Sequence, residues 1–338
     1  MIMKMTDAHI IEKAAHIIIE GGLVAMPTET VYGLAANALD AEAVSRIFTA
    51  KGRPDDNPLI VHVDGLMMAR QTGVMNERAQ ALAERFWPGP LTLVVKSLGM
   101  LPLIVTAGLD TVGIRMPDCD TALSLISAAG VPLAAPSANK SGSPSPTTAA
   151  HVAKDFGDEL FVIDGGACSV GLESTVIDLT ADVPVILRPG VVTQQMIEEC
   201  IGSVENASAE FLSNAAPAAP GMKYRHYAPL AMVTVVEGHA VSVAEAIKYL
   251  YDKDLKKGEK PLVMALRENK RYYGRRDIVI TGSSGDPGEA AKKLYALLRA
   301  ADEQQYSRIY FEAVPKEGIG YAVMNRVYKA ASYNIVKV

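Results

Sequence analysis

Short apolar runs and longer amphipathic stretches alternate along the first two hundred residues. Apolar runs bounded by Gly, Pro or polar residues predict buried strands, and they lie at residues 23–26, 59–63, 91–95, 111–115, 133–135, 160–163, 175–179 and 185–187. Stretches with apolar residues three or four apart predict helices, and they lie at residues 7–20, 41–50, 77–86, 121–129, 148–156 and 193–200. Because strands and helices alternate irregularly, we expect an α/β fold with a twisted mixed sheet and flanking helices.

The pattern stops between residues 205 and 220, which are rich in Ala, Ser, Asn and Pro and typical of a linker. It restarts with expected strands at 232–236, 262–266, 278–281 and 308–311 and expected helices at 243–251, 288–301 and 321–331. We therefore expect a first domain over residues 1–204, a linker over 205–229 and a smaller C-terminal domain over 230–338. The C-terminal domain should be Rossmann-like, a small parallel sheet with helices on both faces.

Length and composition agree with two domains and narrow the class of protein. A single core rarely grows beyond about 250–300 residues, and this chain has 338. The formal net charge of −5 argues against a surface coated with basic residues, so we expect no stable nucleic-acid binding. Three widely spaced cysteines disfavour a disulfide framework or a zinc site. With neither a signal peptide nor a spanning helix indicated, we expect a cytoplasmic protein without a membrane partner.

Polar and charged side chains recur at or beside the ends of the expected strands of the first domain. They are Thr30, Arg53, Arg115, Ser137, Thr175 and Arg188. Neither a P-loop nor the glycine-rich turn of a dinucleotide-binding fold is present, so a nucleotide would be held by scattered side chains. Because a sheet gathers strand ends onto few faces, these arginines, hydroxyls and amides should meet. With no nucleophile–base pair, they favour nucleotidyl transfer by positioning and charge stabilisation.

Each of these candidates also has a purely structural interpretation. Lys51 and Arg53 lie in the turn KGRP, which suits a polyphosphate but also a solvated surface turn. His62 lies inside an apolar strand, where a packed core histidine is more common than a ligand-binding one. Arg115 could bind a carboxylate with its forked guanidinium group or lie at the surface of an edge strand. The residue pattern alone leaves these alternatives open.

A series of longer motifs narrows the choice. PTETVYGLAANAL, KGRPDDNPLIVHV, WPGPLT, TAGLDTVGIRMP, APSAN, GLESTVIDL and LRPG follow one another along the first domain. In this order they closely resemble the YrdC family. The linker segment PGMKYRHYAP and the added α/β domain resemble the long, two-domain form of the L-threonylcarbamoyladenylate synthases. The resemblance therefore implies a YrdC-like first domain followed by the extra domain of the long form.

The resemblance implies an enzyme that makes threonylcarbamoyl-adenylate and pyrophosphate from ATP, L-threonine and bicarbonate or CO2. The adenylate would serve N6-threonylcarbamoyladenosine formation in tRNA, next to the anticodon. The residues that match the family's threonine site are Thr30, His62, Arg115, Ala135 and Thr175. The residues that match its ATP site are Lys51, Arg53, Asn57, Thr111, Ser137, Asn139, Ser145, Arg188 and Tyr227. Of these, Lys51, Arg53 and Arg188 would stabilise phosphate charge, and no general base is assigned.

Three further expectations accompany the resemblance. Mg2+ should accompany the phosphates of ATP, and the sequence shows no dedicated carboxylate cage for it. Residues 222–229, which include Tyr227, should close over the nucleotide as a lid, because a basic and aromatic strip between two domains has little reason to be exposed. The resemblance allows a downstream tRNA threonylcarbamoyl transferase as a partner. The sequence leaves the role of the C-terminal domain open.

Two other functions compete with this one. A non-catalytic RNA-binding module is the first, and the acidic net charge and the lack of a basic, aromatic surface run argue against it. Carbamoyl transfer of the hydrogenase-maturation kind is the second. That assembly carries cysteine-rich zinc motifs, which three scattered cysteines do not supply.

Overall fold

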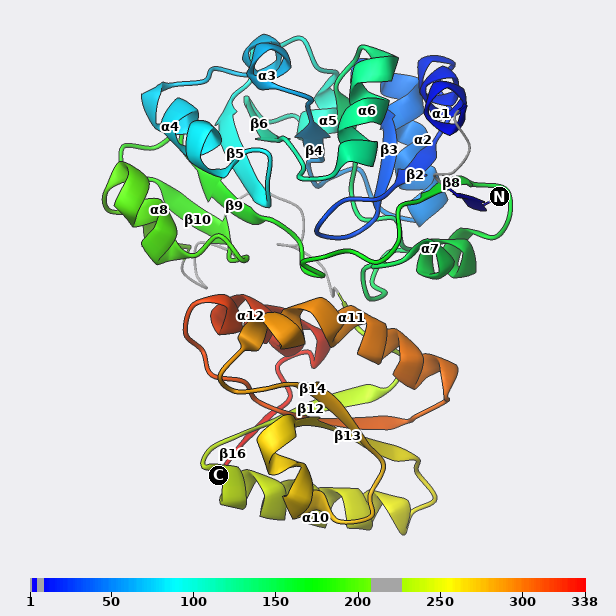
Figure 1. Cartoon of the computed structure of the whole chain (residues 1–338), viewed down its shortest axis with the longest axis vertical. Coiled ribbons are helices and arrows are strands. Elements are labelled where there is room, and N and C mark those ends of the chain that lie inside the picture. The colour runs from blue at the N-terminus through cyan, green and yellow to red at the C-terminus, as the bar shows by residue number, and fades with distance from the viewer. Residues whose placement is uncertain (1, 5–8, 208–226) are drawn as a thin grey trace. The chain divides into compact units, whose positions relative to one another are not determined.

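The computed structural model describes residues 2–4, 9–207 and 227–338. The chain divides into two compact units, Met1–Ser141 with Ser145–Tyr224 and Gly142–Pro144 with Arg225–Val338 (Figure 1). Each unit has its own sheet and its own helices. Among the described residues, no helix combines the length and the apolar character that a membrane crossing requires.

A mixed sheet forms the centre of the first unit, as the irregular alternation of strands and helices predicts. Within the described residues its strand order is β1-β8-β2-β3-β7-β4-β6-β5-β9-β10-β11. The strands are β1 (Ile2–Lys4), β2 (Val24–Met26), β3 (Gly33–Asn37), β4 (Ile60–His62), β5 (Leu91–Lys96), β6 (Thr111–Arg115), β7 (Leu133–Ala134), β8 (Phe161–Asp164), β9 (Thr175–Asp178), β10 (Val185–Arg188) and β11 (Glu205–Asn206). The sheet contains parallel pairs such as β4–β6 and antiparallel pairs such as β5–β6.

The helices of the first unit cover both faces of this sheet. They are α1 (Ile10–Ile19), α2 (Ala41–Lys51), α3 (Leu66–Thr72), α4 (Glu77–Phe86), α5 (Leu103–Thr106), α6 (Asp120–Ala129), α7 (Ala149–Phe156) and α8 (Gln194–Ile201). In β2, Val24 and Met26 pack into one hydrophobic cluster with α1 and α6, while Ala25 packs into the other cluster with α2. Because successive strand residues point to opposite faces, a strand buried on both faces is apolar throughout, which explains the continuous apolar runs.

Several details of the first unit differ from the expected elements, and the short elements β1, α3, α5 and β11 were not predicted. The first helix begins at Ile10 rather than at residue 7, which lies outside the described residues. The strand β3 was not predicted, because its sequence GLAAN consists of residues that rarely favour strands. Small side chains suit that position, since a Cβ atom added to Gly33 would lie 3.3 Å from the Cβ atom of Ala135.

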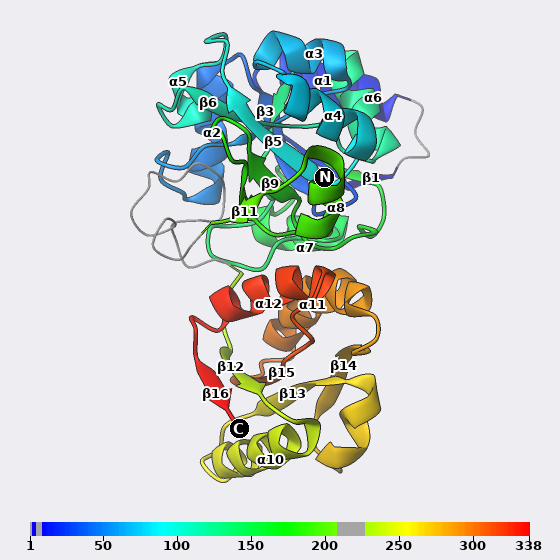
Figure 2. The same ribbon diagram turned by 90° about the vertical axis from the view of Figure 1, so that its left-hand side faces the viewer.

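The second unit confirms the predicted small parallel sheet. Its strand order is β14-β13-β15-β12-β16, and every pair of neighbours is parallel. The strands are β12 (Met232–Glu237), β13 (Pro261–Leu266), β14 (Ile278–Gly282), β15 (Arg308–Glu312) and β16 (Ile335–Lys337). The helices are α10 (Ala240–Leu255), η1 (Arg267–Tyr273), α11 (Pro287–Glu303) and α12 (Ile319–Ala330). Figure 2 shows α10 on one face of the sheet and α11 with α12 on the other.

Candidate active site

The turn between β2 and β3 carries the first polar residues of the site. Thr28 Oγ1 accepts backbone N–H groups of Thr30 and Val31, both at 3.2 Å, which fixes the turn locally. The turn is also tied to distant segments, because the backbone N–H of Val170 donates to the carbonyl oxygen of Glu29 at 2.8 Å. These bonds hold Glu29 and Thr30 in a buried position.

The register of the sheet brings together residues that are far apart in the sequence. His62 on β4 pairs with Arg115 on β6, and Arg188 on β10 pairs with Val176 on β9. The neighbouring residues Val61 and Ile114 pack into the main hydrophobic core. Side chains alternate along a strand, so His62 and Arg115 point to the opposite face of the sheet. The strands β4, β6 and β10 end at these residues, and the pairing of β4 with β6 brings His62 and Arg115 together.

Arg115 and Glu29 form a buried pair of opposite charges. Arg115 Nη2 lies 2.6 Å from Glu29 Oε2, and the two side chains are each 4% exposed. Arg115 also donates from Nη1 to Thr30 Oγ1 at 2.9 Å and from Nε to the Gly89 carbonyl oxygen at 3.3 Å. The angles at the ion pair are not those of a hydrogen bond, and both Glu29 oxygens and Arg115 Nη2 lack hydrogen-bond partners among the described residues. The pair therefore keeps both acceptor and donor capacity for a ligand.

His62 is buried and uncharged next to this pair. Burial, together with the positive charge of Arg115, lowers the pKa of His62 to about 3. Its Nδ1 atom has no hydrogen-bond partner among the described residues. A buried polar atom without a partner costs roughly 1–3 kcal/mol, so a ligand that bonds to it would recover stability. The core interpretation of His62 explains its burial and leaves Nδ1 unexplained.

A hydroxyl network surrounds Arg188. Its Nε donates to the Ser174 carbonyl oxygen at 3.0 Å and its Nη2 to Ser174 Oγ at 3.1 Å. Thr175 donates from Oγ1 to the Val192 carbonyl oxygen at 2.7 Å. Glu173, which precedes Ser174, accepts a hydrogen bond at Oε1 from Ser145 Oγ at 2.6 Å. The segment 173–175, which includes Thr175, therefore contacts both Ser145 and Arg188 and forms one polar region with them.

A second group of predicted residues lies around Lys51, the last residue of α2. Its buried Nζ atom donates to the Asn139 carbonyl oxygen at 2.6 Å and to the Ser137 carbonyl oxygen. Burial, together with the positive charge of Arg53, lowers the pKa of Lys51 to about 7. Two carbonyl oxygens hold one ammonium group, which keeps a third N–H for a ligand oxygen.

The basic turn continues this second group. Arg53 donates from Nη2 to the carbonyl oxygen of the buried Asn57 at 3.2 Å. A surface hollow of about 360 Å³ is lined by Arg53 and residues of α2. Thr111 begins β6 and Arg115 ends it, so they lie roughly 13 Å apart along the strand at about 3.3 Å per residue. The structure therefore places Thr111 away from the end of β6 where Arg115 lies.

Two predicted residues have special environments. Ala135 follows β7, and its N–H donates to the Ile60 carbonyl oxygen at 3.0 Å, so its own carbonyl group is the one left for a ligand. Tyr227 belongs to the second unit and is buried there, with its ring centroid 5.4 Å from that of Tyr295. Residues 222–226 of the expected lid lie outside the described residues.

The sequence analysis assigned no role to Glu29, Glu173 or Ser174. All three are buried and contact predicted site residues. Each lies inside a motif already singled out, PTET or GLEST. In each motif a glutamate lies between polar residues and close to a buried strand, and this pattern could have indicated a role for it. Among the described residues, no group of three or more His, Cys, Asp or Glu side chains is placed to hold a metal ion.

Comparison with known proteins places this site in a family. Residues 16–190 match the Sua5, YciO and YrdC family model, which is described as telomere recombination. Residues 192–332 match the model of the threonylcarbamoyl-AMP synthase C-terminal domain. The crystal structure of P. abyssi Sua5 complexed with L-threonine superimposes with a TM-score of 0.93 at 46% identity, covering 100% of this chain and 99% of that one.

Curated relatives are similar over nearly the whole chain. The threonylcarbamoyl-AMP synthase of Pyrococcus abyssi is 48% identical over 331 residues, which are 96% of this chain and 95% of the relative. The threonylcarbamoyl-AMP synthase of Bacillus subtilis is 43% identical over 331 residues, 97% of this chain and 94% of the relative. The chain therefore belongs to the Sua5, YciO and YrdC family, in the long form that carries the C-terminal domain.

Proposed function

We propose that this chain is a threonylcarbamoyl-AMP synthase, a nucleotidyltransferase that forms threonylcarbamoyl-AMP and pyrophosphate from L-threonine, bicarbonate or CO2, and ATP. Its relatives of the same length carry this name, and the similar P. abyssi structure holds L-threonine. The product would serve N6-threonylcarbamoyladenosine formation in tRNA. We place the activity in the cytoplasm, with a tRNA threonylcarbamoyl transferase as the acceptor of the product.

The buried Arg115–Glu29 pair is the observation that carries this proposal. Threonine is a zwitterion, with a carboxylate and an ammonium group on one carbon. Arg115 Nη2 lacks a hydrogen-bond partner among the described residues and suits the carboxylate, while the unbonded oxygens of Glu29 suit the ammonium group. The threonine hydroxyl is left for His62, with Thr30 and Thr175 beside it and the Ala135 carbonyl group as a further acceptor. A buried pair of opposite charges thus matches a buried pair of opposite charges on the ligand.

ATP is assigned to the second group of residues. Lys51, Arg53 and Arg188 provide positive charge for phosphate oxygens, and we propose that Mg2+ arrives bound to those phosphates. Asn57, Thr111, Ser137, Asn139 and Ser145 provide amide, hydroxyl and backbone groups for the rest of the nucleotide. The roughly 13 Å that separate Thr111 from Arg115 are compatible with an elongated ligand such as ATP. The role of Tyr227 over the nucleotide stays a prediction.

The chemistry follows from placing the two ligands side by side. The threonine ammonium group loses one proton to solvent to become an amine, whose nitrogen forms a bond to the carbon of CO2 and loses a second proton, which gives a carbamate. A carbamate oxygen then attacks the α-phosphorus of ATP, and the bond to the β-phosphate oxygen breaks to release pyrophosphate. Negative charge grows on the phosphate oxygens, where Lys51, Arg53 and Arg188 stabilise it. The rate acceleration comes from positioning the two ligands and from stabilising the phosphate charge, and no covalent enzyme intermediate is needed.

The test is pyrophosphate release from ATP with bicarbonate, with and without L-threonine, together with mass analysis of the nucleotide product. We expect release only with all three substrates and a product with the mass of threonylcarbamoyl-AMP. Arg115→Gln should strongly reduce the threonine-dependent release of pyrophosphate, whereas Arg70→Gln on the exposed face of α3 is the matched control. Pyrophosphate release that is the same without threonine would overturn the proposal.

A further inference from the structure

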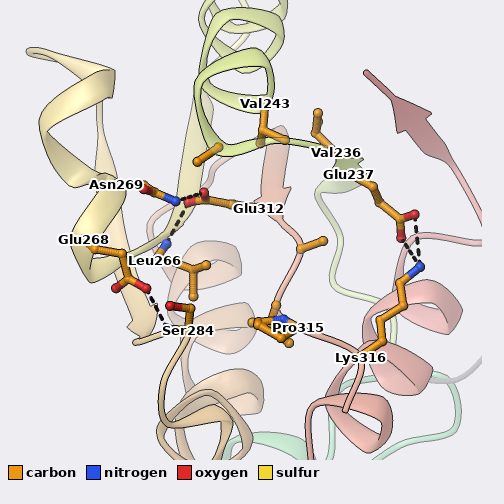
Figure 3. Close-up of a pocket in the computed structure, with 14 residues that line it drawn as sticks. Val236, Glu237, Val243, Leu266, Glu268, Asn269, Ser284, Glu312, Pro315 and Lys316 are labelled. Carbon is orange, nitrogen blue, oxygen red and sulfur yellow. Dashed lines mark hydrogen bonds and ion pairs between the residues drawn. The ribbon is translucent and has the colours of Figure 1, made fainter.

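The second unit contains a pocket that the synthase reaction does not use. It has a volume of about 530 Å³, within the range of small-molecule sites. Residues at the carboxyl ends of three parallel strands line it, including Glu237 at the end of β12, Leu266 at the end of β13 and Glu312 at the end of β15. Figure 3 shows these side chains directed around a common space.

The order of the strands explains why a hollow forms there. β12 and β15 are neighbours in the sheet, but the chain leaves β12 into α10 on one face and leaves β15 toward α12 on the other. Neighbouring strands whose connections depart to opposite faces leave a crevice at their carboxyl ends. In open parallel sheets this crevice is the usual place of ligand binding. The topology therefore marks the pocket as a site independently of its side chains.

The charge of the lining favours a cation. Three carboxylates, Glu237, Glu268 and Glu312, face one ammonium group, Lys316. Lys316 Nζ lies 3.0 Å from Glu237 Oε1, so this pair is balanced. Among the described residues no ion pair involves Glu268 or Glu312. The charge of Arg267 acts on Glu268, so Glu312 is the carboxylate of the lining that no positive side chain balances among the described residues.

Glu312 is the buried member of this set. Its side chain accepts the backbone N–H of Leu266 at 2.8 Å through Oε2 and the amide of Asn269 through Oε1. The residue is 3% exposed, and burial raises the pKa of its carboxyl group. Each carboxylate oxygen accepts more than one hydrogen bond, so both oxygens keep acceptor capacity toward the pocket. A cation bound there would offset the desolvation of Glu312.

The residues that line the pocket indicate whether its cation is a metal ion or an organic molecule. Val236, Val243 and Leu266 form apolar parts of the lining. In the part of the chain that the structure describes, the three glutamates are not placed as a group that could hold a metal ion. Apolar walls around a few polar groups are typical of sites for organic molecules. The ligand should therefore have an aliphatic body and a charged end.

We propose that this pocket binds a small aliphatic cation with primary ammonium groups, held by Glu312 and Glu268 at one side and by the apolar wall along its body. Glu312, which has no ion pair among the described residues, together with Glu268 in the same lining, suits one or two ammonium groups. This site lies wholly within the second unit. The inference does not rest on the synthase activity, and the two are tested separately.

Titration calorimetry of the full chain provides the test, at fixed pH and ionic strength. The probe is 1,4-diaminobutane, and its matched controls are butane-1,4-diol, which is neutral, and succinate, which is anionic with the same number of carbons. We expect saturable binding of the diamine alone. Equal binding of the diol or of succinate, or no diamine binding at millimolar concentration, would overturn the proposal.

Three variants locate the binding. Glu312→Gln removes the charge of the buried carboxylate and should weaken diamine binding by about 10-fold to 100-fold. Ser284→Phe narrows the exposed rim, leaves the core untouched and should weaken binding even if Glu312→Gln destabilises the fold. Glu245→Gln, on the exposed side of α10, is the matched control and should bind like the wild type. Diamine binding that survives both pocket variants would place it elsewhere and contradict the proposal.

Discussion

The two units treat a buried carboxylate in opposite ways. In the first unit, Glu29 lies 2.6 Å from Arg115, yet neither of its oxygens has a hydrogen-bond partner among the described residues. In the second unit, Glu312 has no ion pair among the described residues, but it accepts hydrogen bonds from Leu266 and Asn269. Glu29 is neutralised and poorly bonded, whereas Glu312 is well bonded and not neutralised.

This difference indicates what each site lacks. Buried polar groups are stable only when both charge and hydrogen bonds are balanced. The first site needs hydrogen-bond donors and acceptors in a charge-neutral arrangement, which a zwitterion such as threonine supplies. The second site needs positive charge. The two carboxylates therefore point to two chemically different ligands.

Removing Arg115 should have the largest effect. Arg115→Gln leaves Glu29 buried without a positive partner and removes the proposed carboxylate ligand. We expect kcat/KM for threonine to fall by about 100-fold to 1,000-fold, since truncating one member of a buried charge pair commonly costs 2–5 kcal/mol. Steady-state pyrophosphate release measures it. An unchanged KM for threonine would remove Arg115 from the binding site.

The charge of Lys51 should control ATP binding and its pH dependence. The pKa of Lys51 is lowered to about 7 by burial, so the ligand-free protein loses this positive charge as pH rises above about 7. ATP affinity should then fall by up to about 10-fold per pH unit. Lys51→Arg, which stays charged, should bind ATP more weakly but without this slope. Parallel pH profiles for the two proteins in a binding assay would contradict the assignment.

His62 should make the first unit sensitive to acid. Its pKa is lowered from 6.5 to about 3 in the folded chain, so between these values the unfolded chain binds more protons than the folded one. The free energy of unfolding should therefore rise with pH across this window and fall as pH drops, by at most about 1.4 kcal/mol per pH unit from this group. In His62→Gln this part of the slope should be absent. Denaturant unfolding at several pH values compares the two.

Surface charge in the second unit should matter least. Lys248 Nζ lies 3.0 Å from Glu245 Oε1, one turn earlier on α10, and the Glu245 side chain is largely exposed. Lys248→Ala should lower the free energy of unfolding by less than about 0.5 kcal/mol, because water and salt screen such pairs. If Lys248→Ala lowered the free energy of unfolding as much as Arg115→Gln does, burial would not be what distinguishes the Arg115–Glu29 pair from the Lys248–Glu245 pair. Denaturant unfolding at low and high salt provides the measurement.

Local patterns predicted most of the fold. The apolar run of β4 and the amphipathic helix α4 were predicted within a residue of their bounds, because each depends only on neighbours in the sequence. The strand β3 was missed since its Gly and Ala residues are chosen by what packs against them rather than by strand preference. Tertiary packing determines such a segment, and one sequence does not show it.

The sequence motifs named candidate residues for the site, but they did not indicate how these residues are arranged. That His62 lies beside Arg115 depends on the pairing of β4 with β6, and strand order is a property of the whole sheet. For the same reason Glu29 received no role, although it stands next to Thr30 in the sequence. The pocket around Glu312 gave no signal at all, because its residues come from four separated segments. The pairing of strands that are distant in the sequence determines this arrangement, and local periodicity in the sequence does not show it.

The most direct test of the central claim is threonine binding to the double variant Glu29→Gln with Arg115→Gln, measured by calorimetry in the presence of ATP. The variant replaces the buried charge pair by two neutral amides, so it leaves no unpaired buried charge, and its unfolding midpoint is measured alongside to show that the fold is kept. We predict that threonine affinity falls at least about 100-fold while the fold persists. Wild-type affinity in the folded double variant would contradict the claim that this pair binds the amino acid.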